Sequence, residues 1–232
     1  MQKTILITGA NRGLGLEFTR QYVAAGWRVI ATSRTPANAT ALQELAAKYP
    51  DIQIHALDVA DFAAIDALAA QLKAEKIDVL LNNAGIFGDE TGKGIGQLDY
   101  TNWAATLLTN TIAPIKIAEA FLDHVERGQD KLIASVSSLM GSVGDNTSGG
   151  CYLYRSSKAG LNAAMKSLSI DLCPRGIGVV ILHPGWVKTD MGGTNAPIEV
   201  EESIAGMRQV LADFTLEQSG SFIRYDGKLA PW

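Results

Sequence analysis

The stretch TGANRGLG at residues 8–15 lies between a short apolar run, residues 4–7, and a segment with helical periodicity. Its three glycines allow a tight turn and let backbone N–H groups approach a phosphate at the start of the helix. A glycine pattern alone is weakly diagnostic, and a plain turn between a strand and a helix is the simpler interpretation. Because a strand precedes the glycines and a helix follows them, we interpret the segment as a dinucleotide-binding turn.

The rest of the chain repeats this alternation of strand and helix. Short runs rich in β-branched residues or leucine predict strands near Lys3–Thr8, Arg28–Ser33, Ile52–Leu57, Val79–Asn82, Lys131–Ser137, Val179–His183 and Ser221–Tyr225. Helical periodicity predicts helices near Gly15–Ala25, Ala37–Tyr49, Phe62–Glu75, Asn102–Arg127, Tyr154–Leu172 and Glu199–Asp213. This order predicts an α/β fold with a doubly wound, mostly parallel sheet of the Rossmann type and the last strand at an edge. In such a sheet we expect the chemistry in the loops that follow the strands.

Length and charge narrow the range of functions. The chain of 232 residues suits one α/β domain spanning residues 1–232 and is too short for two. With 20 Lys and Arg against 24 Asp and Glu, the net charge is −4, so we expect neither nucleic acid nor a membrane as a partner. The chain opens with a strand-like run in place of a signal peptide, which predicts a cytoplasmic protein.

The cysteines and histidines are few and scattered. Cys151 and Cys173 have the spacing of neither a disulfide framework nor a zinc site. His55, His124 and His183 fall in or beside apolar segments and have no acidic or cysteine ligands paired with them. We therefore expect no metal.

The end of the second predicted strand bears on the choice of nucleotide. In a dinucleotide-binding sheet, an acidic residue at this point bonds the ribose hydroxyls of NAD. Ser33 and Arg34 stand here instead. Arg34 and Arg12, the latter inside the glycine turn, offer two guanidiniums for a 2′-phosphate, so we expect NADPH in preference to NADH. The alternative is a pair of surface arginines without a ligand.

A candidate proton donor lies downstream, in the stretch GCYLYRSSK at residues 150–158. Tyr154 and Lys158 are four residues apart, which places a phenol and an ammonium on one face of a helix. The cation would favour the phenolate, lower the pKa of Tyr154 and so suit proton transfer near neutral pH. Tyr152 has no lysine four residues later. Such a pair can also mark a solvated helix face, so its significance depends on the motifs around it.

These motifs occur, from residue 4 to residue 191, in the order typical of the short-chain dehydrogenase/reductase family, which the chain resembles. The resemblance implies transfer of hydride between a nicotinamide and a small carbonyl or alcohol substrate. In that reaction Ser138 would polarise the substrate oxygen and Tyr154 would act as acid and base. Lys158 would hold the nicotinamide ribose, and Asn110 would anchor a proton-relay water near it. Ser138 fits the family's frame of a serine followed by x-x-Gly better than Ser137, but the long loop of residues 142–150 leaves both as candidates.

The resemblance also implies which residues contact the nucleotide. Asp58 would meet the adenine, and Val187 and Thr189 would present a backbone group and a hydroxyl to the carboxamide and phosphates. An Asp after a strand can equally be a helix cap, and Pro-Gly at a strand end is often only a turn. The whole expected set is Gly9, Asn11, Arg12, Gly13, Leu14, Gly15, Ser33, Arg34, Asp58, Val59, Asn83, Ala84, Gly85, Tyr154, Lys158, Pro184, Gly185, Val187 and Thr189.

A narrower resemblance, carried by residues 146–150, 154–158 and 226–232, is to the C-factor and sniffer-like carbonyl reductases. The segment after Asp190 is short and rich in small residues, which implies an open pocket for aldehydes, ketones or quinones. The alternative is a non-catalytic NADPH-binding signalling or sensor protein of the C-factor type. The two long helices, which join subunits in many relatives, would allow a homodimer or a homotetramer, although their small residues equally suit packing on the sheet.

Overall fold

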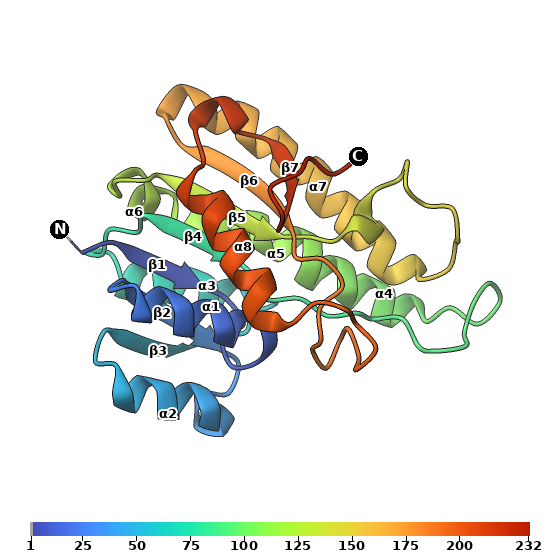
Figure 1. The fold of residues 1–232 in the computed structure, drawn as a ribbon, viewed down its shortest axis with the longest axis horizontal. Helices are drawn as coiled ribbons and strands as arrows, with labels where there is room; N and C mark the ends of the chain where they lie inside the picture. The colour runs from blue at the N-terminus through green and yellow to red at the C-terminus, as the bar shows by residue number, and fades with distance from the viewer. Residues whose placement is uncertain (1) are drawn as a thin grey trace.

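The computed structural model, which describes residues 2–232, is built on one sheet of seven strands in the order β3-β2-β1-β4-β5-β6-β7 (Figure 1). Every neighbouring pair in the sheet is parallel. The strands are β1 Thr4–Ile7, β2 Arg28–Ser33, β3 Ile52–Ala56, β4 Val79–Asn82, β5 Leu132–Val136, β6 Gly178–His183 and β7 Ser221–Arg224. The predicted α/β fold with a doubly wound sheet is therefore confirmed, including a last strand at the edge.

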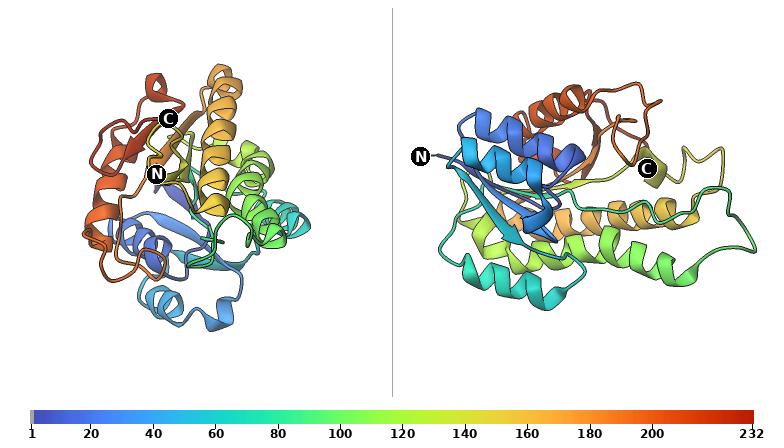
Figure 2. Two further views of the ribbon diagram at one scale, coloured as in Figure 1. Left: turned by 90° about the vertical axis from the view of Figure 1, so that its right-hand side faces the viewer. Right: turned by 90° about the horizontal axis from the view of Figure 1, so that it is seen from below.

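Helices cover both faces of the sheet (Figure 2). The α-helices are α1 Gly13–Ala24, α2 Thr40–Lys48, α3 Phe62–Gln71, α4 Tyr100–Leu107, α5 Ala113–Ala120, α6 Leu122–Glu126, α7 Tyr152–Leu172 and α8 Val200–Ala212. Short 3-10 turns occupy Pro36–Asn38 (η1), Leu139–Gly141 (η3), Cys173–Arg175 (η4) and Leu216–Gln218 (η5), and Leu108–Ile112 (η2) is a π-helical turn. Helices α1, α2 and α8 pack on one face, while α3, α5, α6 and α7 pack on the other.

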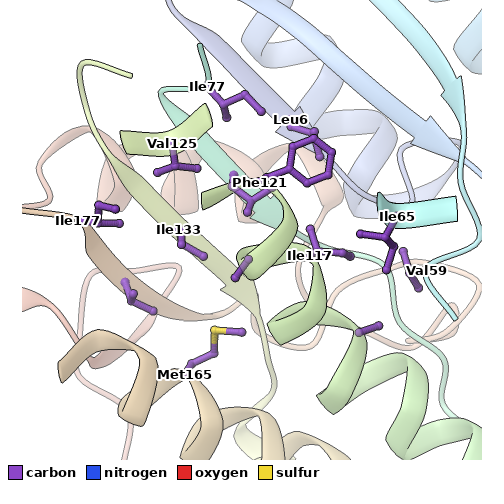
Figure 3. Close-up of a cluster of buried hydrophobic side chains, with 14 of the residues drawn as sticks. Leu6, Val59, Ile65, Ile77, Ile117, Phe121, Val125, Ile133, Met165 and Ile177 are labelled. Carbon is purple, nitrogen blue, oxygen red and sulfur yellow. The ribbon is translucent and has the colours of Figure 1, made fainter. Parts of the chain in front are cut away.

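Because both faces of the sheet are buried, the sequences of its strands are continuous apolar runs. In β1 the side chain of Leu6 points into one core, and those of Ile5 and Ile7 point into the other. Phe121 lies in the first core with Leu6 and Ile117, completely buried (Figure 3). Each face thus has its own hydrophobic cluster, and the sheet is the wall between them.

The single helix predicted for Asn102–Arg127 is instead a series of shorter helices. The axis continues from α4 through the π turn into α5, because the joining residues Leu108 and Ala113 keep right-handed helical torsions. The chain leaves this geometry at Phe121, after which α6 begins. The π turn contains Asn110, one of the predicted site residues. Periodicity predicts the helical stretch but does not detect a change of hydrogen-bond register within it.

None of the helices within residues 2–232 has both the length and the apolar character needed to cross a membrane.

The two-faced core leads to a prediction for a matched pair of helical isoleucines. Ile65 of α3 is completely buried, whereas Ile170 of α7 is 63% exposed. Ile65→Ala should lower the free energy of unfolding by about 2–5 kcal/mol, because it leaves a cavity under the sheet. Ile170→Ala should change it by no more than about 0.5 kcal/mol. Urea denaturation measures both, and equal effects would contradict the described core.

Candidate active site

The glycine turn after β1 is closed by a side chain from the loop after β4. The amide of Asn83 donates to the backbone carbonyls of Thr8 (2.9 Å) and Gly9 (3.2 Å). A Cβ on Gly15 would collide with the Gly9 carbonyl and with the Asn83 amide, so only glycine fits there. The first turn of α1 also receives no side-chain cap from its N-cap residue Arg12. Its backbone N–H groups are therefore available to an anion such as a pyrophosphate.

The loop after β4 lies between this turn and the centre of the site. The hydroxyl of Thr8 accepts hydrogen bonds from the backbone N–H groups of Asn83 and Ala84, each at 3.0 Å. At the next residue, a Cβ on Gly85 would lie 3.2 Å from the Asn110 side chain and 3.6 Å from Lys158 Nζ. This loop therefore joins the predicted nucleotide end of the site to the predicted chemical end.

The residues predicted to meet the adenosine lie around the ends of β2 and β3. Ser33 is buried and Arg34 is exposed at the end of β2. The carboxylate of Asp58 accepts from the N–H of Ala60 at 3.0 Å, which is a local turn, whereas the N-cap of the next helix, α3, is Asp61, so Asp58 is not the helix cap of the simpler interpretation. The structure gives Arg12 a partner that the sequence did not reveal, because its guanidinium donates to the Asp190 carboxylate at 3.0 Å.

Tyr154 and Lys158 lie in α7, and both are buried, with exposed fractions of 9% and 4%. The Lys158 ammonium lies 5.7 Å from the centre of the Tyr154 ring and donates to the carbonyl of Val136 at 2.8 Å. The structure separates the two candidate serines: Ser137 donates to the Asn162 side chain at 2.6 Å and is buried. Ser138 is the serine that lies beside the Tyr154 phenol, where its hydroxyl acts to lower the pKa of Tyr154, and it also accepts from the N–H of Met140 at 3.2 Å.

The predicted lowering of the Tyr154 pKa is wrong for this structure. Burial raises the pKa of Tyr154 to about 12, and the hydrogen bond from Ser138 opposes this rise only in part. Burial also lowers the pKa of Lys158 to about 8. The spacing of the two residues suggested that the cation would favour the phenolate, but desolvation dominates because both groups are removed from water. At neutral pH the phenol carries its proton, as a phenol with the usual pKa of 10 also would, and burial makes it a weaker acid.

Asn110 holds the loop after β4 against α7. Its side-chain oxygen accepts from the N–H of Ile86 at 2.9 Å, and its amide donates to the Ile86 carbonyl at 2.8 Å and to the Ser157 hydroxyl at 3.0 Å. The residue is 1% exposed. The side chain of Asn110 is therefore used to position backbone next to Lys158, and the relay water at this point stays a prediction.

The segment after β6 covers the glycine turn. Gly185 has a positive φ of 84°, and a Cβ there would collide with Ile198. Downstream, the Thr189 hydroxyl accepts from the N–H of Gly192 at 3.0 Å. The Thr189 methyl would lie 3.7 Å from a Cβ on Gly13. Thr189 is thus brought to the turn that was predicted to hold the phosphates. The predicted residues Pro184 and Val187 are both buried in the same segment.

His183 is a site residue that the sequence analysis missed. It ends β6, is 8% exposed, and its Nδ1 accepts from the backbone N–H of Leu139, the residue after Ser138. Burial, aided by the positive charge of Arg224, lowers the pKa of His183 to about 4. The neutral ring therefore supports the backbone turn that carries the Ser138 hydroxyl. No local pattern could reveal this, because the contact joins two strands that are adjacent only in the folded sheet.

The sequence and fold of this chain are similar to those of known proteins. The family model described as short chain dehydrogenase matches residues 3–199. The C-signal protein of Myxococcus xanthus is 42% identical over 166 residues, which cover 72% of this chain and 99% of that protein. The structure of the carbonyl reductase Sniffer of D. melanogaster superposes with a TM-score of 0.93 at 38% identity, covering all of both chains. The NADPH-bound carbonyl reductase from chicken fatty liver gives a TM-score of 0.92 at 37% identity, covering 100% of this chain and 99% of that one.

The buried His183 leads to a prediction about stability in acid. Its pKa in the folded protein lies below the usual 6.5, so its contribution is complete above pH 6.5 and is lost as the pH falls towards 4. A shift of this size corresponds to about 3 kcal/mol. His183→Gln keeps a hydrogen-bond acceptor but does not titrate. The stability advantage of the wild type over this variant should therefore shrink by about 3 kcal/mol between pH 7 and pH 4 in urea denaturation. A difference independent of pH would contradict the assigned role.

Proposed function

The chain belongs to the short-chain dehydrogenase/reductase family, and from that premise we propose that it is an NADPH-dependent carbonyl reductase. It is an oxidoreductase of the carbonyl reductase-like type. We propose further that its substrates are small aldehydes, ketones or quinones, and that residues 1–232 act as one catalytic domain. The observation that carries the proposal is the buried pair of Tyr154 and Lys158 on one face of α7, with the ammonium 5.7 Å from the centre of the phenol ring and Ser138 beside the phenol.

In the reducing direction, Tyr154 donates its phenolic proton to the carbonyl oxygen of the substrate, while the hydroxyl of Ser138 donates a hydrogen bond to the same oxygen. The nicotinamide, when bound, supplies the hydride to the carbonyl carbon. The phenolate left on Tyr154 is stabilised by the nearby Lys158 ammonium. With a pKa of about 8, Lys158 can also release a proton near neutral pH and so help to restore the phenol.

The nucleotide end fits a dinucleotide in this chain's own geometry. Gly9 and Gly15 allow the turn to pack closely against Ala84 and Asn83, and the first amides of α1 lack a side-chain acceptor, so they can bind a pyrophosphate. Arg12 and Arg34 are the cations we assign to the 2′-phosphate, which would be the basis of the preference for NADPH. The NADPH-bound relative from chicken liver supports this choice.

The substrate side supports broad acceptance of apolar carbonyl compounds. Trp186, Met191 and Val143 are exposed by 57%, 50% and 77%, and they belong to the loops after β6 and β5. Small residues follow Met191, at 192–195. A short segment of small residues would leave room for substrates of different sizes.

A signalling role is the second candidate, because a relative at 42% identity bears the name C-signal. A purely nucleotide-binding sensor would not require a buried phenol with a serine beside it and an ammonium one helical turn away. The two candidates are separated by following NADPH absorbance against a panel of aldehydes, ketones, quinones and alcohols. Nucleotide binding without oxidation of NADPH by any carbonyl compound would favour the sensor.

Replacing the proposed proton donor tests the mechanism. Tyr154→Phe removes only the hydroxyl, so kcat for carbonyl reduction should fall by about 10²–10⁴-fold. The dissociation constant for NADPH should stay within about twofold, since the ring keeps its packing against Phe87. Tyr152→Phe is the matched control and should keep its activity. A Tyr154→Phe enzyme with most of its kcat would exclude Tyr154 as the acid.

The nucleotide preference is tested at the end of β2. Arg34→Asp should lower kcat/KM with NADPH by about 10–100-fold, as expected for loss of a charge-assisted hydrogen bond and gain of repulsion. The value of kcat/KM with NADH should stay the same or rise, because a carboxylate can accept from ribose hydroxyls. Steady-state kinetics with both nucleotides measures the ratio, and an unchanged ratio would reject Arg34 as a phosphate ligand.

A further inference from the structure

Helix α7, which carries Tyr154, begins without a cap of its own. Its N-cap residue Cys151 makes no side-chain hydrogen bond to the helix and has left-handed torsions, φ 47° and ψ 48°. Gly149 and Gly150 before it also have positive φ values of 65°. An N-cap residue normally has extended torsions and offers a side-chain oxygen to the second or third N–H of the helix. The chain just before α7 does not provide this acceptor.

Asp89 provides the acceptor from another part of the molecule. Its Oδ1 accepts from the N–H of Leu153 at 3.2 Å, and its Oδ2 accepts from the N–H of Tyr154 at 2.8 Å. These are the second and third N–H groups of α7, the two that an N-cap side chain would serve. The negative charge also complements the positive end of the helix dipole. One carboxylate thus performs the capping role that Cys151 does not.

The loop that carries Asp89 is itself held in place. Asn110 binds both backbone groups of Ile86, and the ring of Phe87 lies 5.0 Å from the Tyr154 ring between centroids. The Gly88 carbonyl accepts from the side chain of Asn102 in α4. Three consecutive residues are therefore fixed just before Asp89. In Figure 1 the loop runs from the end of β4 past the N-terminus of α7 to α4, at the right of the view.

We infer that Asp89 is a positioning residue for Tyr154: by capping α7 from the loop after β4, it fixes the backbone of the proton donor relative to Ser138. The first turn is the part of a helix that frays most readily, and Tyr154 lies in it. Lys158, one turn further on, is held independently by the carbonyl of Val136. Loss of the cap should therefore displace the phenol and leave the ammonium in place. This role rests on the proposed function of Tyr154.

The test compares Asp89→Ala and Asp89→Asn with Glu90→Ala. Glu90 is the adjacent carboxylate and pairs with Lys93 on the surface, so its loss changes the charge without removing the cap. Amide hydrogen exchange of Leu153 and Tyr154 should accelerate about fivefold to 30-fold in Asp89→Ala. The single-turnover rate of carbonyl reduction at saturating NADPH should fall about tenfold, while the dissociation constant for NADPH stays within twofold.

The Asn variant keeps one carbonyl oxygen as an acceptor, so its exchange and its rate should lie between those of the wild type and the Ala variant. Glu90→Ala should match the wild type in every measurement. Unchanged exchange at Tyr154 in Asp89→Ala would overturn the cap, and faster exchange with an unchanged single-turnover rate would overturn the positioning role.

If Asp89→Ala does not fold, the Asn variant decides by the same criteria. A wild-type protein without turnover would contradict the proposed function, while the exchange data would still decide whether Asp89 caps α7.

Discussion

The site depends on one buried interaction, the hydrogen bond from the Lys158 ammonium to the carbonyl of Val136 at the end of β5. Removing an ammonium from water is unfavourable, and the fall of its pKa from 10.5 to about 8 corresponds to about 3 kcal/mol against the charged form. The contact nevertheless fixes α7 against the end of β5. The turn that carries Ser138 begins directly after this end. The same burial that lowers the pKa of Lys158 raises the pKa of Tyr154, so the packing of α7 sets both the position and the acidity of the two groups.

The loop after β4 connects the two ends of the site. At its start, Asn83 closes the glycine turn, and Gly85 lies where any side chain would press on Asn110 and approach Lys158. At its end, Asp89 caps the helix of Tyr154. A parallel sheet makes this arrangement available, because the carboxyl ends of its strands meet at one edge and their loops become neighbours. Movement of this loop would therefore affect both nucleotide binding and proton transfer.

Features that depend on local chemistry could be predicted from the sequence. The glycine turn, the order of strands and helices, and the position of Tyr154 four residues before Lys158 all follow from spacing and residue type. The direction of the phenol's pKa shift could not be predicted, since it depends on burial by distant segments. For the same reason, His183 and Asp89 were missed: each serves a backbone N–H brought near only by folding. Ser138 was distinguished from Ser137 only when the structure gave the latter a buried partner.

The most direct test of the account is a pH titration of the Tyr154 phenol by NMR, with the ring carbon that bears the hydroxyl labelled with ¹³C, in the free protein and with saturating NADP⁺. The account predicts that the free phenol stays protonated beyond the usual pKa of 10, with a midpoint near 12. It also predicts that NADP⁺ lowers the midpoint, because the oxidised nicotinamide brings a positive charge beside the ring. A phenol that titrates near 10 and does not respond to NADP⁺ would show that it is neither buried nor next to the nucleotide, which would contradict the account.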